Sequence, residues 1–511
     1  MKKFTLVLLL SSFFGFSQWT QKGSNILGTH LFGTVVACNA DGTAIAVGTP
    51  YATKQYLGNP TANRGEVKVY QYVGGSWVQK GTTIDCENNS YGATLYSGFG
   101  RSIVLSDSGN RLAIASDNNV TTYYYNGSDW VSNFAALPLS ANYSEDSNKV
   151  SLAMSNDGLK IVVGYSNESI YGDQLGRVVV CELNTTTNTW SQIGNTMASA
   201  FTADWFGTSV SCNQDATRVV VGAPYHNSQT GRAKVFDHNT TTNTWDAVAN
   251  VVNGDATADF FGFSVSMSDS GTSFVVGAPD YDNAPNTDTG EVKVFERLSP
   301  IAPWTQKGSA LFPNGNQNNV GFGTGVSMAA NGDKIAVSLP NFSDTNLPFN
   351  NGLANAGRVK IYNYTASDWV FTSNINGEIA SENLGDSISL SSDGTTIAVG
   401  SPAYKITGGS AVTGDGVARV FQSGGLSVNE IEIISKINLY PNPSNGKSTV
   451  DLGEFFENVK VSISNIEGKM VYKNQYFQTN QIKFDLNLQS GLYFVGISTE
   501  KANKTIKMAI E

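Results

Sequence analysis

The sequence predicts an all-β protein in which a seven-bladed β-propeller is followed by a small Ig-like β-sandwich. Three observations support this prediction. A pattern of four short strands recurs seven times between residues 19 and 422. The chain opens on the one strand that the last copy lacks. After residue 436 the repeat ends, and a different β-rich unit begins at a pair of prolines.

The N-terminus has the features of an export signal. Lys2 and Lys3 precede an apolar run over residues 4–10, and small residues at 15–17 offer a cleavage site before Gln18. We therefore predict a signal peptide at 1–17. The apolar run is too short to span a bilayer, and no later segment reaches 18 unbroken apolar residues. The sequence thus predicts an extracellular protein without a transmembrane segment.

The composition is typical of many short strands joined by turns. Only 14% of the residues are charged, 40% are hydrophobic, and glycine is abundant, with 52 residues. The net charge of −10 argues against nucleic acid as a partner, because phosphate binding needs a basic surface.

The repeat is defined by landmarks that keep a constant order. A strand with a tryptophan is followed by a Phe-Gly step, a turn such as NADG at 39–42, an apolar strand ending near Gly-x-Pro, and a strand such as VKVYQY at 67–72. The tryptophans of the seven copies are Trp19, Trp77, Trp130, Trp190, Trp245, Trp304 and Trp369. Units of four strands in about 58 residues have the size of a propeller blade.

The phase of the repeat predicts a closed ring. The seventh copy stops after VARVF at 417–421 without a tryptophan strand, whereas the chain begins with one at residues 19–26. The N-terminal strand can therefore complete the last blade and cover both sheet edges. We predict that the propeller spans residues 18–425.

The four cysteines do not form a recognisable disulfide framework. Cys38 and Cys212 occupy equivalent repeat positions where other copies carry Leu or Met, so we interpret both as small core residues. Cys181 replaces an aromatic strand residue, and Cys86 falls in a loop. The spacing leaves a bond between these two open.

The alternation of Phe-Gly steps with GAP-like strand ends resembles the FG-GAP repeats of bacterial surface proteins, which are related in pattern to the integrin α-subunit propeller. Members that bind calcium carry an Asp-rich loop between the first two strands of the blade. Here those connections are tight turns, at 39–42, 155–158 and 391–394, and one or two carboxylates cannot supply six to eight ligand oxygens. We therefore expect no cofactor, and the calcium sites of the family are not carried over.

The last 75 residues, 437–511, form a separate unit after a linker at 426–436. Strands are expected at 459–463, 469–472, 482–486, 492–497 and 505–508. The unit closely resembles the type A C-terminal sorting domain of the type IX secretion system of Bacteroidetes. The matching residues are Tyr440, Pro441, Asn442, Pro443, Gly468, Gly491, Tyr493, Lys504 and Lys507. The resemblance implies passage through the outer membrane by that machinery, and release or attachment at the cell surface.

A binding site is expected on the face that receives the long loops, since rigid scaffolds commonly present variable loops for recognition. The candidate ligand-binding residues on it are Tyr51, Tyr225, His226, Tyr281 and Tyr404. The tyrosines follow the Gly-x-Pro of four copies and suit either stacking on a ligand or wedging of adjacent blades. The best candidate for a metal site is the acidic loop with Asp280, Asp282 and Asp288.

Catalysis has little support in the sequence. The three histidines, His30, His226 and His238, do not recur with a carboxylate or serine motif, so we assign no catalytic residue. Our main hypothesis is a non-enzymatic surface or secreted adhesion protein that binds a glycan or protein ligand. The alternatives are an exported glycan-degrading enzyme with carboxylates at the mouth of the propeller, and a structural matrix component.

Overall fold

The computed structural model describes residues 19–56, 59–61, 64–85, 98–117, 119–133, 137, 150–166, 175–248, 250–313, 317–344, 353–365, 367–405, 415–424, 437–465, 469–499 and 503–511. The chain divides into two compact units between Ser423 and Gly424. The predicted signal peptide and linker lie outside the described residues, as do Cys86 and Gly468.

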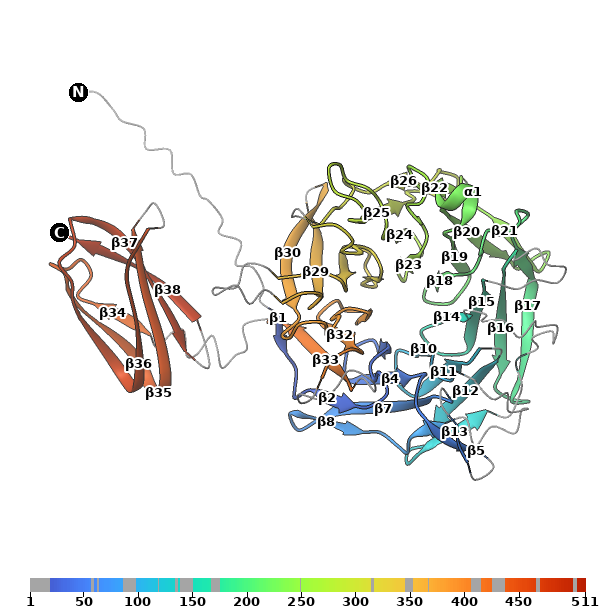
Figure 1. The fold of residues 1–511 in the computed structure, drawn as a ribbon, viewed down its shortest axis with the longest axis horizontal. Helices are drawn as coiled ribbons and strands as arrows, with labels where there is room; N and C mark the ends of the chain where they lie inside the picture. Colours follow the sequence, from blue (N-terminus) through green and yellow to red (C-terminus); the bar gives the residue numbers. More distant parts are fainter. Residues whose placement is uncertain are drawn as a thin grey trace. The chain divides into compact units, whose positions relative to one another are not determined.

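In the first unit, the described residues form seven antiparallel sheets, each built on a path of four strands and arranged as propeller-like blades (Figure 1). We number these blades 1 to 7 in chain order. The strands of blades 1 to 3 are β3 (Val35–Cys38), β4 (Ala44–Thr49), β7 (Glu66–Val73), β8 (Ser76–Gln79) and β9 (Ile84–Asp85); β10 (Ser102–Leu105), β11 (Arg111–Ala115), β12 (Val120–Tyr125) and β13 (Trp130–Asn133); and β14 (Val150–Met154), β15 (Lys160–Tyr165), β16 (Arg177–Asn184) and β17 (Thr189–Ala198). A hairpin of β5 (Lys54–Tyr56) and β6 (Asn59–Thr61) lies between β4 and β7.

The remaining blades follow the same plan. Their strands are β18 (Ser209–Cys212), β19 (Arg218–Ala223), β20 (Arg232–Asn239), β21 (Thr244–Ala247) and β22 (Val252–Asn253) in blade 4; β23 (Ser264–Met267), β24 (Ser273–Ala278), β25 (Glu291–Glu296) and β26 (Thr305–Gln306) in blade 5; β27 (Val326–Met328), β28 (Lys334–Leu339), β29 (Arg358–Thr365) and β30 (Asp368–Asn376) in blade 6; and β31 (Ser387–Leu390), β32 (Thr396–Ser401), β33 (Gly416–Ser423), β1 (Trp19–Gln21) and β2 (Ile26–Gly28) in blade 7. One short helical turn, α1 (His226–Gln229), precedes β20 among the described residues.

The second strand of each blade is apolar on both faces because a neighbouring blade covers each face. In β4, Ile45 and Val47 pack in one cluster with Ala398 and Val420 of blade 7. Ala46, whose side chain points the other way, packs in the cluster that contains residues of blade 2. The run IAVGT of the sequence therefore reflects burial between two blades, whereas the polar positions of the third and fourth strands lie nearer the rim.

The predicted closure by the N-terminal strand is confirmed. β1 and β2 both pair antiparallel with β33, with Trp19 opposite Ser423 and Ile26 opposite Ala418. The amide of Lys22, between the two strands, donates to the carbonyl of Val420 at 2.7 Å. The first strand of blade 1, β3, also contacts the first strand of blade 7, β31, so the ring closes at its inner as well as its outer layer.

The glycines of the repeat mark places where the backbones of consecutive blades touch. A Cβ on Gly222 of β19 would lie 2.0 Å from the carbonyl oxygen of Gly262, which follows Phe261 at the start of blade 5. Gly262 itself has a φ of +93°, a conformation that L side chains rarely adopt. The glycine at the end of the second strand and the glycine of the Phe-Gly step are thus required together, because each leaves room for the other blade.

The tryptophan strand carries a second contact between blades. Trp77 of blade 1 donates its indole N–H to the carbonyl of Lys22 at 2.7 Å, and the Lys22 ammonium donates to the carbonyl of Gly42 in the turn of blade 1 at 2.9 Å. The same pair of bonds joins Lys80 to Trp130 and Gly109, and Lys307 to Trp369 and Gly332. Each lysine therefore fastens the outer strand and the turn of the next blade to its own.

The turns between first and second strands also bond to one another around the ring. In each, a glycine or alanine in the fourth position closes the turn, as where Gly158 N–H donates to Ser155 O at 2.8 Å. The second residues are linked by backbone hydrogen bonds from Ala40 to Asp107, Asp107 to Asn156, Asn156 to Gln214, Gln214 to Asp269, Asp269 to Ala330, and Ala330 to Ser392. Asp393 N–H donates to Ala40 O at 3.4 Å and returns the series to its start. We call this closed series the turn circle.

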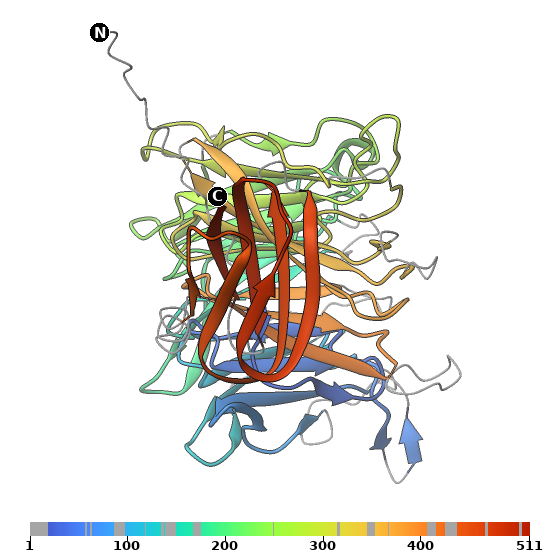
Figure 2. The ribbon, with the colours of Figure 1, turned by 90° about the vertical axis from the view of Figure 1, so that its left-hand side faces the viewer.

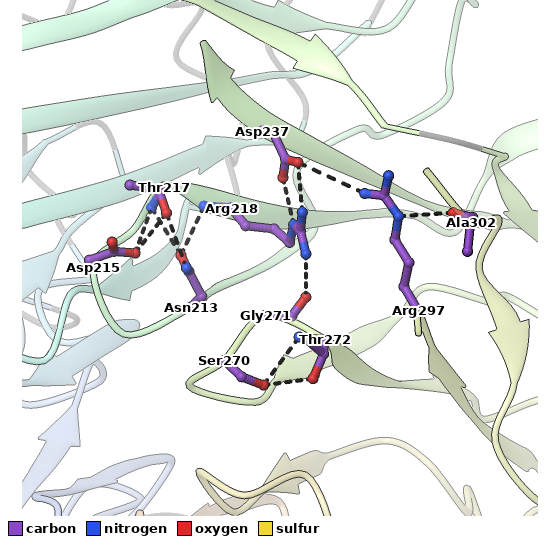
Figure 3. A network of polar contacts seen from close by, with 10 residues as sticks. All are labelled: Asn213, Asp215, Thr217, Arg218, Asp237, Ser270, Gly271, Thr272, Arg297 and Ala302. Carbon is purple, nitrogen blue, oxygen red and sulfur yellow. Dashed lines mark hydrogen bonds and ion pairs between the residues drawn. The ribbon is translucent and has the colours of Figure 1, made fainter. Parts of the chain in front are cut away.

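Ion pairs strengthen the boundary between blades 4 and 5 (Figure 3). The Arg218 guanidinium binds both oxygens of Asp237, at 2.5 and 2.7 Å, and donates to the carbonyl of Gly271 in blade 5 at 2.8 Å. Arg297 of blade 5 approaches the same carboxylate at 3.9 Å and donates to the carbonyl of Ala302. A bidentate pair of this kind fixes geometry more than a single contact does.

The second unit is one curled sheet of five strands, the red strands of Figure 2, rather than a sandwich of two separate sheets. Its strands are β34 (Asn438–Tyr440), β35 (Lys447–Asn465), β36 (Met470–Asp485), β37 (Gly491–Thr499) and β38 (Asn503–Ile510). β35 and β36 pair along nearly their whole length, with a register shift between Asp451 and Phe456 that lets the sheet turn around its apolar core.

The two strands predicted at 469–472 and 482–486 are therefore parts of a single strand. The polar stretch between them gives no alternating signal, but Asn474 and Phe477 are held opposite Val461 and Asn458 of β35. Pairing with a long neighbour decides the extended conformation there, which the local sequence does not indicate.

The three described cysteines are free thiols. Cys181 is fully buried in blade 3, and burial raises the pKa of its thiol to about 12. Burial also raises the pKa of Cys38 to about 11 and that of Cys212 to about 12. These thiols are therefore inert at neutral pH.

Removing the strands that close the ring should destabilise the first unit. We expect Trp19→Ala to lower the free energy of unfolding by about 3 kcal/mol, because a buried indole is lost at the closing blade. Leu27→Ala, in β2 but 46% exposed, is the matched control and should change stability little. Thermal and denaturant unfolding measure both, and equal effects of the two variants would contradict closure as a source of stability.

Candidate binding site

The second strands end and the third strands begin on one face of the ring, opposite the turns between first and second strands, and this is here called the long-loop face. In four blades the described residue before the third strand lies beside the Phe-Gly or Leu-Gly step that enters the next blade. Parallel bridges join Gly65 to Phe99, Gly231 to Phe261, Gly290 to Phe322, and Gly357 to Leu384. Loops from consecutive blades are therefore held side by side on a rigid base.

The four predicted tyrosines belong to four different blades and have separate surroundings. Tyr51 is 37% exposed with the Arg101 guanidinium 5.9 Å from its ring, and Tyr404 lies 5.0 Å from the guanidinium of the buried Arg419. The ring of Tyr281 packs at 5.6 Å from Phe312, in the connection that enters blade 6. The contact of Tyr51 with Arg101 of the next blade is consistent with the wedging role left open by the sequence, whereas Phe312 follows Leu311, which pairs with Val292 of the same blade as Tyr281.

Tyr225 lies at the centre of an aromatic cluster. Its ring stacks on Trp205 with the centroids 4.0 Å apart, and meets the edge of Phe260, from the step into blade 5, at 5.1 Å. The sequence places Tyr225 and His226 together after Gly-x-Pro, but Trp205 comes from the preceding connection. This cluster fixes the start of the loop that carries His226.

His226 lines a pocket of about 560 Å³ on the long-loop face. Its walls come from two segments, residues 201–204 before the Phe-Gly step and residues 225–229 around α1. Phe201, Thr202, Asn227 and Ser228 are exposed there. The volume falls within the roughly 300–1,000 Å³ of sites that hold small ligands.

A buried carboxylate positions the imidazole. Asp204 is fully buried, and its Oδ1 lies 2.7 Å from His226 Nδ1. Its Oδ2 accepts hydrogen bonds from Arg232 at 2.6 Å and from the hydroxyl of Ser199. The Arg232 guanidinium is the counter-charge of the Asp204 carboxylate, and a carboxylate oxygen at this distance accepts a hydrogen bond from Nδ1–H of His226. The side chain of His226 is 18% exposed.

A second pocket of about 420 Å³ adjoins the first and shares His226 and Asn227 with it. The other side is formed by Thr230, Gly231 and residues 253–257. Asp255 within that stretch binds the ammonium of Lys293 at 2.6 Å, and Lys293 also contacts Glu291 at 3.0 Å. Burial raises the pKa of Glu291 to about 7 in spite of the lysine.

The backbone between the pockets is held in a rare conformation. Asn227, Ser228 and Gln229 have φ values of 50°, 56° and 68°, three consecutive residues in the left-handed region. Such residues cost about 1–2 kcal/mol each and persist where the surroundings fix them. Phe260 N–H donates to Gln229 O at 2.9 Å, and Gly231 N–H donates to His226 O at 2.9 Å. The next blade thus braces the loop.

Phe201, Asp204 and Arg232 were not among the residues expected from the sequence. The sequence contains a signal for Asp204 and Arg232. The first is an acid two residues before the Phe-Gly step, and the second is an arginine at the start of the third strand. In blade 7 the acid at the same position, Glu382, pairs instead with Arg419, which stands two residues further along the third strand; both side chains are fully buried and approach to 2.7 Å. The contact of Phe201 with the His226 ring, at 4.9 Å, had no signal.

The carboxylates of the acidic loop of blade 5 interact within the loop. Asp288 N–H donates to Asp282 Oδ1 at 2.9 Å, and burial together with the charges of Asp288 and Asp282 raises the pKa of Asp280. Within the described ranges, no group of three or more histidine, cysteine, aspartate or glutamate side chains could hold a metal ion.

Two of the carboxylates in the turn circle, those of Asp107 and Asp269, influence each other on the opposite face. Asn156 donates its side-chain N–H to Asp269 at 2.9 Å, across the intervening blade 4. Burial and the negative charge of Asp269 raise the pKa of Asp107 to about 6. The side chains of these turn residues therefore converge toward the middle of the ring.

The predicted sorting residues join the two ends of the second unit. The side chain of Asn442 donates to Lys507 O at 2.6 Å and accepts from Ala509 N–H at 2.9 Å, so the opening segment is fastened to β38. Lys504 donates to Ile437 O, and the hydroxyl of Tyr493 donates to Gln489 O at 2.9 Å. Gly491 begins β37, while Tyr440, with Pro441 and Pro443 beyond it, is 47% exposed.

Residues 438–511 match the secretion system C-terminal sorting domain. The chain is therefore exported by the type IX secretion system to the cell surface or the extracellular space, and this domain implies interaction with that machinery. No curated protein matches the chain. In the part of the chain that the structure describes, no helix has the length and apolarity to traverse a bilayer.

Breaking the pair of Asp204 and Arg232 should destabilise the first unit. Asp204→Asn leaves a buried guanidinium without its counter-charge, and we expect a loss of about 3 kcal/mol. Asp255→Asn is the control, because that carboxylate is half exposed and its ion pair should contribute less than about 1 kcal/mol. Denaturant unfolding measures both, and a smaller loss for Asp204→Asn than for Asp255→Asn would contradict the assigned role.

The turn circle should make stability depend on pH. The pKa of Asp107 is higher in the folded protein than its ordinary 3.8, so the folded state binds more protons and stability falls as the pH rises from about 4 through about 6. Asp107→Asn should remove this fall, giving about 1 kcal/mol more stability at pH 7.5 after solvent screening and little change at pH 4. Unfolding curves across this range test it, and a variant less stable at pH 7.5 would refute the repulsion.

Proposed function

We propose that the protein is a non-enzymatic binding protein that acts in adhesion at the cell surface or outside the cell. In this proposal the first unit is a seven-bladed β-propeller of the FG-GAP type over residues 18–425, joined by a linker at 426–436 to the sorting domain at 437–511. A signal peptide at 1–17 directs the first step of export. The ligand, a glycan or a protein, binds on the long-loop face.

The pocket at His226 is the observation that supports this proposal most directly. It combines exposed aromatic and amide side chains with a buried Asp204–Arg232 pair that fixes the imidazole. The strained turn at residues 227–229 is held by neighbouring blades, as expected where a rigid base presents a recognition loop. Sorting by the type IX system places that face where extracellular ligands are available.

One observation favours a second candidate, an exported glycan-degrading enzyme. Asp107 and Asp269 converge in the turn circle, and the raised pKa of Asp107 is the property of a carboxyl group that can act as a general acid. Asp269 is engaged by Asn156, which suits a structural role equally. The two candidates differ in the face of the ring that they use.

A binding screen of the full-length exported protein tests the proposal. The protein is applied to polysaccharides and to bacterial and host cell surfaces, with and without calcium, and the length of each glycan is followed. We expect binding without shortening, and a loss of about tenfold in affinity for His226→Ala, because a hydrogen bond in a partly desolvated site is removed.

His238→Ala, at the far end of β20, is the matched control and should bind normally. Calcium dependence would implicate the loop with Asp280, Asp282 and Asp288. Shortened glycan that persists in His226→Ala and is abolished by Asp107→Asn would establish the enzyme instead. Absence of binding to every surface would refute an adhesion role.

A further inference from the structure

We infer that the two pockets on either side of His226 form one groove that binds a neutral, extended polysaccharide. This inference rests on the proposed binding function and adds the class of ligand and its path.

The pockets lie on either side of a shared part of the loop. His226 and Asn227 line both, so a ligand that fills one pocket and continues past the imidazole enters the other. Each pocket alone has the size of a small-ligand site. Together they suit consecutive units of a chain rather than a single compact molecule.

The walls carry the groups that recognise sugar hydroxyls. The second pocket offers the amide of Asn253 and the hydroxyls of Thr230 and Thr257, and the first adds Thr202, Ser228 and Gln229. Such side chains donate and accept hydrogen bonds at short range, as a polyhydroxylated ligand requires.

Phe201 supplies an apolar platform at one end. Its ring is 53% exposed, although the Arg232 guanidinium lies 4.9 Å from its centroid and the His226 ring meets it at 70°. Two contacts thus fix an aromatic ring that remains half open to solvent. An exposed ring held in this way suits stacking against the C–H face of a pyranose.

The charge of the groove selects neutral glycans. Neither pocket has a lysine or arginine among its lining residues, and the second contains the half-exposed carboxylate of Asp255. The Lys293 ammonium that pairs with Asp255 also binds Glu291, so among the described lining residues a sulfated, phosphorylated or uronic-acid polymer meets no cation that is left to pair with its charge. A polymer without charge has no such penalty.

Calorimetric titration of the full-length protein tests the inference with soluble neutral polysaccharides (laminarin, xyloglucan and amylopectin) and two anionic ones (alginate and pectate). We expect binding within the neutral set only. Phe201→Ala should weaken it about fivefold to tenfold through loss of stacking. Tyr124→Ala, which removes a 40% exposed aromatic ring of blade 2 outside both pockets, is the matched control and should have no effect.

A length series of the bound glycan tests whether the pockets act as one groove. Affinity should rise about tenfold from disaccharide to hexasaccharide, and Asn253→Ala should remove that rise without changing disaccharide binding. Far-ultraviolet circular dichroism confirms that each variant is folded. A length dependence unaffected by Asn253→Ala would overturn the groove.

Some outcomes would overturn the neutral-glycan ligand alone, and others would overturn the binding function as well. Tighter binding of alginate or pectate, or capture of an unfolded protein such as gelatin that is lost in Phe201→Ala, would overturn the neutral-glycan ligand while leaving a binding role. If Tyr51→Ala abolished neutral-glycan binding and Phe201→Ala did not, the binding site would lie at blade 1 rather than at His226. No binding to these probes or to cell surfaces would refute both proposals.

Discussion

The close approach of consecutive blades is the constraint on which the first unit depends. At Gly222 and Gly262 the backbones of blades 4 and 5 come so near that a single added carbon would lie 2.0 Å from a carbonyl oxygen. This packing buries both faces of each second strand, which explains runs such as IAVGT. It also leaves the chain no freedom at the boundary, so the Phe-Gly step and the glycine after the apolar strand recur together.

Because every blade is held by two neighbours, the ring needs its last boundary as much as any other. β1 and β2 complete blade 7 by pairing with β33. The turn circle joins blade 7 to blade 1 on the opposite face. Nearer the rim, the hydrogen bonds between each lysine and the tryptophan of the next blade also join consecutive blades. A closed ring can therefore hold its loops rigidly without disulfides among its described cysteines.

That rigidity is what permits the unusual loop at His226. Three left-handed residues in succession would not persist in a free loop, but hydrogen bonds from Phe260 and Gly231 fix them between two blades. The buried carboxylate of Asp204 then orients the imidazole while Arg232 balances its charge. The second unit uses a comparable device, since Asn442 fastens its opening segment to the closing strand.

The sequence by itself determined the features that local or periodic patterns encode: the seven repeats, their four-strand plan, the tight turns, the closing N-terminal strand and the sorting tail. Only the tertiary structure decided which residues meet. Phe201 and Asp204 contact His226, and Arg232 contacts Asp204, because the segments around residues 201–204 and 225–232 converge in the fold. The repeat marks the positions of the acid and the arginine, but it does not report that the acid contacts the imidazole. Likewise, β36 is continuous because β35 pairs with its polar middle, an interaction between distant residues that the local sequence cannot express.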